Sequence, residues 1–130
     1  MKKIICISLF LSFCISSCAP VIFFGAGTAA GVAGYKYYQG ALVVIYQAPF
    51  EETYVASQSA LEKMDIQIES KTKEPTSGKI KAQLSDGKSV SLGFKYRSAE
   101  ETEVVIRVGL FGDEDASMVI KDEIRKELFK

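Results

Sequence analysis

The sequence predicts an α+β domain, a two-layer sandwich in which two helices cover one face of a mostly antiparallel sheet. Four consecutive runs between residues 66 and 108 alternate apolar and polar residues, and segments before and after them repeat apolar residues at intervals of three and four. A period of two is typical of half-buried strands, and the longer interval is typical of amphipathic helices. We therefore expect the element order β-α-β-β-β-β-α.

The predicted first strand leads directly into the first helix. Residues 42–46, Leu-Val-Val-Ile-Tyr, form a β-branched run that is typical of a strand. Pro49 favours the start of a helix shortly afterwards, because its missing amide proton would have no acceptor in the first turn. The residues that form the apolar stripe of this helix are Phe50, Tyr54, Ser57, Leu61 and Met64.

The four alternating runs predict a meander over residues 65–109. Asp86 and Gly87 between the second and third runs favour a tight hairpin, since both residues tolerate positive φ. Short connections between the other runs also favour antiparallel pairing. The expected inward residues are Ile66, Ile68, Ile80, Ala82, Leu84, Val90, Leu92, Phe94, Tyr96, Val104, Ile106 and Val108.

Residues 113–115, Asp-Glu-Asp, begin the last predicted helix, whose inner face carries Ile120, Ile124 and Leu128. Asp113 is the expected N-cap, and the acids after it suit the positive end of the helix dipole. Such a run can also suggest calcium, but calcium takes about six to eight oxygens from a loop that folds around it. We interpret the acids as helix capping and expect no metal site.

The N-terminus resembles the signal peptide of a bacterial lipoprotein. Two lysines precede an apolar run over residues 4–15, which is shorter than the about 20 residues of a membrane-spanning helix. The stretch Ile-Ser-Ser-Cys that ends at Cys18 then resembles a lipobox. Residues 1–17 are thus expected to be removed and Cys18 to be lipidated; an ordinary secretory signal with an incidental Cys18 is the alternative.

The resemblance to lipoproteins also implies a location in the cell. Such proteins carry three acyl chains, and stable anchoring takes two or more. Residue 19 is Ala rather than Asp, which by analogy with Gram-negative lipoproteins permits sorting to the outer membrane. We expect a protein of the bacterial cell envelope, lipid-anchored in the outer membrane and facing the periplasm.

Residues 18–40 are glycine-rich, and the part from 19 to 35 carries no charge. A G-x-G-x-x-A match at residues 25–30 is a weak nucleotide-binding signal, because the later acid of that motif is missing. Gly27 and Gly31 would suit a membrane-inserted or self-associating helix. A lipidated tether is the simplest interpretation, and it leaves the folded domain at residues 41–130.

The composition limits the chemistry of this protein. The chain has no histidine, and Cys18 is the only cysteine after residues 1–17, which excludes Cys/His zinc sites, His-assisted nucleophiles and an internal disulfide. Removal of residues 1–17 takes two of the 16 basic and none of the 16 acidic residues, which leaves a net charge of −2 and no general attraction to nucleic acid. We expect neither an enzyme nor a cofactor.

The outward residues of the meander form the one candidate binding surface. It would contain Lys79, Lys81, Lys95, Arg97 and Arg107, with Lys88 at a hairpin tip. This surface can meet anionic headgroups, cell-wall polymers or an acidic protein. Alternatively, it is a solvated face whose lysines protect strand edges from pairing, and Glu69 and Glu103 on the same face would dilute its charge.

Several motifs together resemble a family of small bacterial lipoproteins of unknown function. They are the lipobox, the uncharged glycine-rich stretch, the Leu-Ser-Asp-Gly hairpin at residues 84–87, and Ile-Arg-Val-Gly-Leu-Phe-Gly-Asp-Glu at residues 106–114 before a final helix. The resemblance supports the fold and the address and brings no activity or catalytic residue.

Two functions follow from these features. The first is a non-enzymatic envelope lipoprotein that binds another envelope component, a protein or a cell-wall polymer, through the basic face or a strand edge. The alternative is a structural or assembly protein that oligomerises or inserts into the membrane through its glycine-rich segment.

Overall fold

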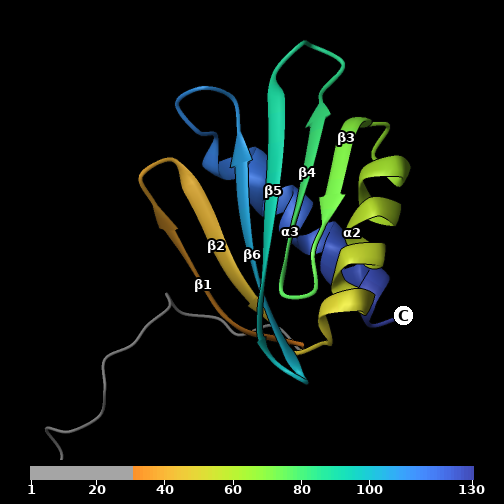
Figure 1. Ribbon diagram of the computed structural model, residues 1–130. Helices are drawn as coiled ribbons and strands as arrows, with labels where there is room; N and C mark the ends of the chain where they lie inside the picture. The colour runs from red at the N-terminus through yellow and green to blue at the C-terminus, as the bar shows by residue number, and fades with distance from the viewer. Residues whose placement is uncertain (1–30) are drawn as a thin grey trace, which may run out of the picture.

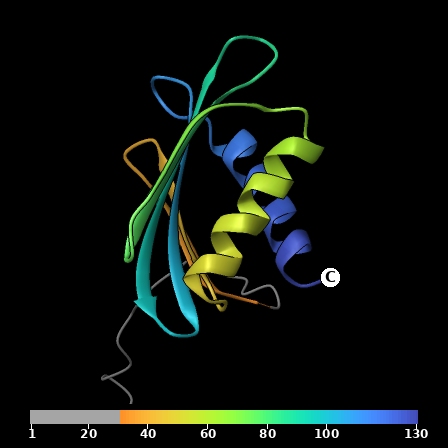
Figure 2. The same cartoon turned by 45° about the vertical axis from the view of Figure 1, so that its right-hand side comes forward.

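The computed structural model describes residues 31–130, which form one sheet with two helices on one of its faces (Figures 1 and 2). The predicted signal peptide, Cys18 and residues 19–30 lie outside the described residues. The α+β prediction is confirmed, and the order β-α-β-β-β-β-α is found with one further strand in front of it.

Every pair of neighbouring strands in this sheet is antiparallel. The strands are β1 (Val32–Tyr38), β2 (Ala41–Tyr46), β3 (Gln67–Lys73), β4 (Ser77–Gln83), β5 (Ser89–Ser98) and β6 (Glu101–Val108), in the spatial order β1-β2-β6-β5-β4-β3. Strands β3 to β6 are the predicted meander. Strand β2 pairs with the side of β6 that β5 does not occupy. The β1–β2 hairpin, which comes first in the sequence, therefore extends the sheet next to β6, the last strand in the sequence.

Strand β1 corrects the predicted domain boundary at residue 41, because the sheet begins at Val32. The hairpin between β1 and β2 closes through Gln39 and Gly40, which both have positive φ, 49° and 79°. Two such residues form the type I′ turn that suits the twist of a hairpin. The sequence did not predict β1 for two reasons. Gln-Gly is not the usual Asn-Gly or Asp-Gly hairpin signal, and the uncharged, glycine-rich run before it resembles a flexible tether.

Gly31 lies in a turn before β1, with φ of 86°, and a side chain at this position would overlap the ring of Phe129. The predicted helical face of Gly27 and Gly31 therefore does not continue through Gly31. Among the residues that the structure describes, no helix has the length and apolar character to cross a membrane.

Helices α2 (Phe50–Lys63) and α3 (Glu114–Leu128) pack against each other on the same face of the sheet (Figure 2). Pro49 is the N-cap of α2. The predicted N-cap of α3 is confirmed, since the Asp113 carboxylate accepts the Ala116 N–H at 3.0 Å. This hydrogen bond stabilises the charged form and holds the pKa of Asp113 below its usual value.

The core lies between the two helices and the sheet, and its largest fully buried side chains include Leu42, Leu61, Ile80, Leu92, Ile106, Ile120 and Ile124. Tyr46 joins the layers, because its hydroxyl donates to the Lys121 carbonyl oxygen of α3 at 2.9 Å. Ser57 is buried in the predicted apolar stripe, where its hydroxyl donates to the Thr53 carbonyl oxygen at 2.7 Å. Tyr96 was expected to point inward but is 44% exposed, next to an irregularity in the β5–β6 register.

Candidate functional site: the open face of the sheet

The sheet has one face without helices, which we call the open face (Figure 2). Its residues alternate with the core residues, so Lys79 and Lys81 point outward on either side of buried Ile80. The structure places all five predicted cations on this face: Lys79, Lys81, Lys95, Arg97 and Arg107. Their binding role stays a prediction.

Lys36 of β1 adds a sixth cation to the open face. It lies opposite Val43 in the register, and Val43 lies opposite Val105. Sequence reasoning missed Lys36 because β1 itself was not predicted. The alternation of Tyr35, Lys36 and Tyr37 before a glycine turn was the signal available.

The open-face cations differ in how they are paired. Arg97 forms an ion pair with Glu103, with Nη1 and Oε2 3.2 Å apart, and Lys95 lies opposite Glu103 in the register. Arg107 donates from Nη2 to the Gln39 carbonyl oxygen at 3.0 Å, which ties it to the β1–β2 turn. Within residues 31–130 the ammonium groups of Lys36, Lys79, Lys81 and Lys95 have no hydrogen-bond or ion-pair partner. They are therefore available to an anionic ligand.

The surface between these lysines is made of small and apolar residues. One row across five strands runs from Lys79 through Gly93, Val105 and Val43 to Lys36. A Cβ at Gly93 would meet only the Cβ of Val105, at 3.9 Å, so there is free space above this position. The row is low in its middle and carries an ammonium group at each end.

Charge is segregated between the two faces. On β1, β2, β4, β5 and β6, the six outward cations are accompanied by two outward carboxylates, Glu101 and Glu103, which gives the open-face residues of these five strands a net charge of +4. The chain from Cys18 onward carries 14 basic and 16 acidic residues, a net charge of −2, so the rest of its residues carry −6. The two helices hold eight acidic and four basic residues, a net charge of −4, so the domain presents a basic face opposite an acidic helical layer.

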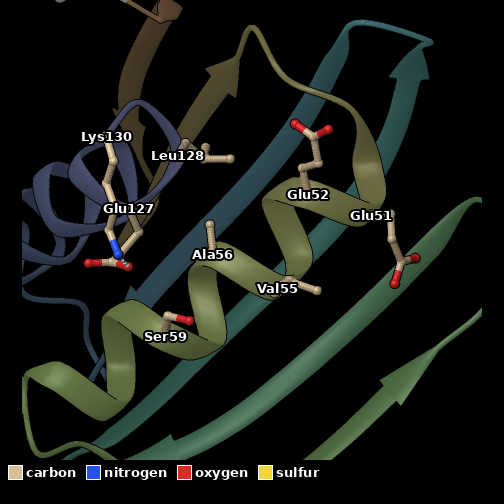
Figure 3. A pocket seen from close by; sticks show the side chains of 8 residues that line it. All are labelled: Glu51, Glu52, Val55, Ala56, Ser59, Glu127, Leu128 and Lys130. Atoms are coloured by element: carbon tan, nitrogen blue, oxygen red, sulfur yellow. Dashed lines mark ion pairs between the residues drawn. The ribbon is translucent and has the colours of Figure 1, made fainter.

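A groove of about 440 Å³ between the helices is a second candidate site (Figure 3). Its lining residues are Glu51, Glu52, Val55, Ala56, Ser59, Glu127, Leu128 and Lys130. Glu127 accepts from both Lys63 and Lys130, which holds its pKa below the usual value, and Glu51 pairs with Lys73 at 2.7 Å. Figure 3 shows Glu51 and Glu52 pointing apart. Glu51 and Glu127 are engaged in ion pairs, and the three carboxylates do not converge as a pair of catalytic acids would.

No group of three metal-binding side chains is assembled within residues 31–130. The acids at the start of α3 illustrate this, because Asp113 caps the helix and also pairs with Lys88 at 3.5 Å.

The loop between β6 and α3 contains surface residues that sequence reasoning did not single out as a site. Leu110 is 85% exposed and Phe111 is 92% exposed. They lie between Gly109 and Gly112, whose φ values are 74° and 84°. The only signal in the sequence for an exposed loop was the position of Leu-Phe between two glycines. In the sequence analysis these residues were used only as part of the family motif.

The chain matches the family model described as Protein of unknown function (DUF3568) over residues 2–127. It belongs to this family. The match covers the DUF3568 domain from β1 through most of α3 and confirms membership of an uncharacterised family. The comparison with curated proteins gave no match.

Proposed function

We propose that this DUF3568 protein is a lipid-anchored bacterial envelope lipoprotein, not an enzyme, that binds an anionic component of the envelope on the open face of its sheet. The segregation of charge carries this proposal: the outward residues of β1, β2, β4, β5 and β6, on the face that no helix covers, carry a net charge of +4, while the two helices carry −4. An anionic ligand is attracted to the first surface and repelled by the second.

The anchor in this proposal is Cys18, in the outer membrane with the domain in the periplasm. The lipobox-like order of residues before Cys18 supports it. Residues 19–31 then link the lipid to β1 and serve as the tether. Attachment raises the local concentration of the domain at the membrane, so even weak contacts of the open face are populated.

Two experiments test the two halves of the proposal. Cys18→Ala should abolish fatty-acid labelling and release the protein from the membrane fraction; labelling that persists would contradict the anchor. For the face, in-cell crosslinking should capture an envelope component that the double variant Lys79→Glu and Lys81→Glu no longer reaches.

The matched control for the face variant is Lys71→Glu with Lys126→Glu. Both control lysines are exposed and lie outside the open face, on β3 and α3, and the change in net charge is the same. Crosslinks that survive on the face variant, or that are lost equally in the control, would refute the open face as the binding surface.

A further inference from the structure

The loop of Gly109, Leu110, Phe111 and Gly112, which we call the apolar loop, exposes two consecutive large apolar side chains. Single exposed apolar residues are common on protein surfaces, but neighbouring ones at the tip of a loop mark an interaction site. Tyr38, on the adjacent β1–β2 hairpin, is 60% exposed and adds a third such side chain.

Contacts at its base hold the apolar loop in place. The Gly109 N–H donates to the Ser89 carbonyl oxygen at 2.7 Å. A Cβ at Gly112 would overlap the carbonyl oxygen of Gly40 and lie 2.6 Å from the Tyr37 hydroxyl oxygen, so only glycine permits the loop to return this closely past the β1–β2 hairpin. The two apolar side chains are therefore exposed to solvent on a loop whose conformation is fixed by these contacts.

The apolar loop is continuous with the open face. A Cβ at Gly40 would lie 2.8 Å from the Phe111 carbonyl oxygen and 2.9 Å from Nη1 of Arg107, so the loop and this open-face cation meet at Gly40. In Figure 2, the loop and the β1–β2 hairpin both project on the side of the sheet away from the helices. Glu114 and Asp115 are in the first turn of α3, in the helical layer.

A lipid bilayer satisfies the two parts of this surface at once. Its anionic headgroups match cations that are spread over β1, β4, β5 and β6 rather than gathered around a cavity. Its interfacial region accepts apolar side chains that reach below the headgroups. The acidic helical side would be repelled, so the charge pattern also fixes which side of the domain faces the lipid.

We propose that the open face rests on an anionic bilayer, with Leu110 and Phe111 inserted among the headgroups. This inference rests on the proposed function and names its ligand, anionic lipid. The basic face attracts the domain to the bilayer and orients it, and the apolar loop inserts its side chains below the headgroups.

The test uses the lipid-anchored protein reconstituted in vesicles. The chain contains no tryptophan, so Phe111→Trp places a single fluorophore at the loop tip. With phosphatidylglycerol in the vesicles, its emission should shift to the blue and be quenched by brominated acyl chains. Val119→Trp, at a position on α3 that is 57% exposed, is the control and should keep the emission of a water-exposed tryptophan.

Charge and lipid composition complete the test. Vesicles of phosphatidylcholine alone should give the Phe111→Trp protein a much smaller shift. Adding Lys79→Glu and Lys81→Glu should lower the ratio of anchored protein with an inserted loop to anchored protein with a water-exposed loop by at least about 25-fold, since one lysine near an anionic surface contributes about fivefold. Lys71→Glu with Lys126→Glu should leave that ratio unchanged.

A loop tryptophan that stays water-exposed in anionic vesicles would overturn the inference, as would equal quenching in the Val119→Trp control. If in cells the same lysines are nevertheless needed for crosslinks to a protein or a cell-wall polymer, the ligand is that component. In that case the lipid inference is wrong and the proposed function stands.

Discussion

Tyr46 links β2 to α3, and Tyr46→Phe tests this link between the layers. The side chain is fully buried, and its hydroxyl donates to the Lys121 carbonyl oxygen at 2.9 Å. Loss of a buried hydrogen bond costs about 1–3 kcal/mol when its acceptor is left unsatisfied. Because the Lys121 carbonyl also accepts a hydrogen bond within α3, we expect the lower end, about 1 kcal/mol at pH 7.

The same substitution predicts a pH dependence. Burial raises the pKa of Tyr46 well above its usual value of 10.0, so above pH 10 the unfolded chain loses this proton while the folded chain keeps it. The folded state then binds more protons than the unfolded state, and the Tyr46 contribution falls by about 1.4 kcal/mol for each pH unit. The cost of Tyr46→Phe should vanish between pH 10 and 11, and the variant should be the more stable protein above that.

The assay is chemical denaturation of both proteins at several pH values between 7 and 11, followed by circular dichroism. Tyr38→Phe is the control, since Tyr38 is 60% exposed and its hydroxyl accepts only from its neighbour Gln39 at 3.2 Å within the described residues. That variant should match the wild type within about 0.5 kcal/mol. A difference between Tyr46→Phe and wild type that does not change with pH would refute the reasoning.

Three further outcomes test the fold. Ile106→Ala, at a fully buried central position, should cost about 2–5 kcal/mol in denaturant unfolding; a loss under 1 kcal/mol would argue against the central place of β6. Asp113→Ala should lower the thermal midpoint and Asp113→Asn should largely restore it, because both Asp and Asn cap helices. Gly112→Val should destabilise the domain, since φ of 84° and the nearby Tyr37 hydroxyl both exclude a branched side chain; an unchanged midpoint would contradict the described loop.

Strong periodic patterns made most of the fold predictable. The apolar stripe of α2 and the alternation of β4, β5 and β6 arise because each element buries one face. Such a pattern therefore predicts the element without knowledge of the elements that it packs against. The same alternation placed Lys79 and Lys81 on one face, because their outward direction follows from the burial of Ile80.

Strand β1 was not predictable in this way. It lies at the edge of the sheet and contains Gly34, and its pairing depends on a Gln39–Gly40 turn that no strong local motif marks. Lys36 was missed for the same reason.

The exposure of Leu110 and Phe111 was also outside the reach of sequence reasoning. Apolar residues are expected inside, and their direction here depends on how Gly112 passes β1. Only the packed structure shows that they adjoin the open face at Gly40 and Arg107.

The central claim is that the open face is the binding surface of a lipid-anchored domain, and site-specific photocrosslinking in cells tests it most directly. A photoreactive amino acid at Ser91, between Lys81 and Arg107 in the register, should crosslink to an envelope lipid, protein or cell-wall polymer. The same group at Val119 on the helical side should remain uncrosslinked. Crosslinks from Val119 and none from Ser91 would contradict the account.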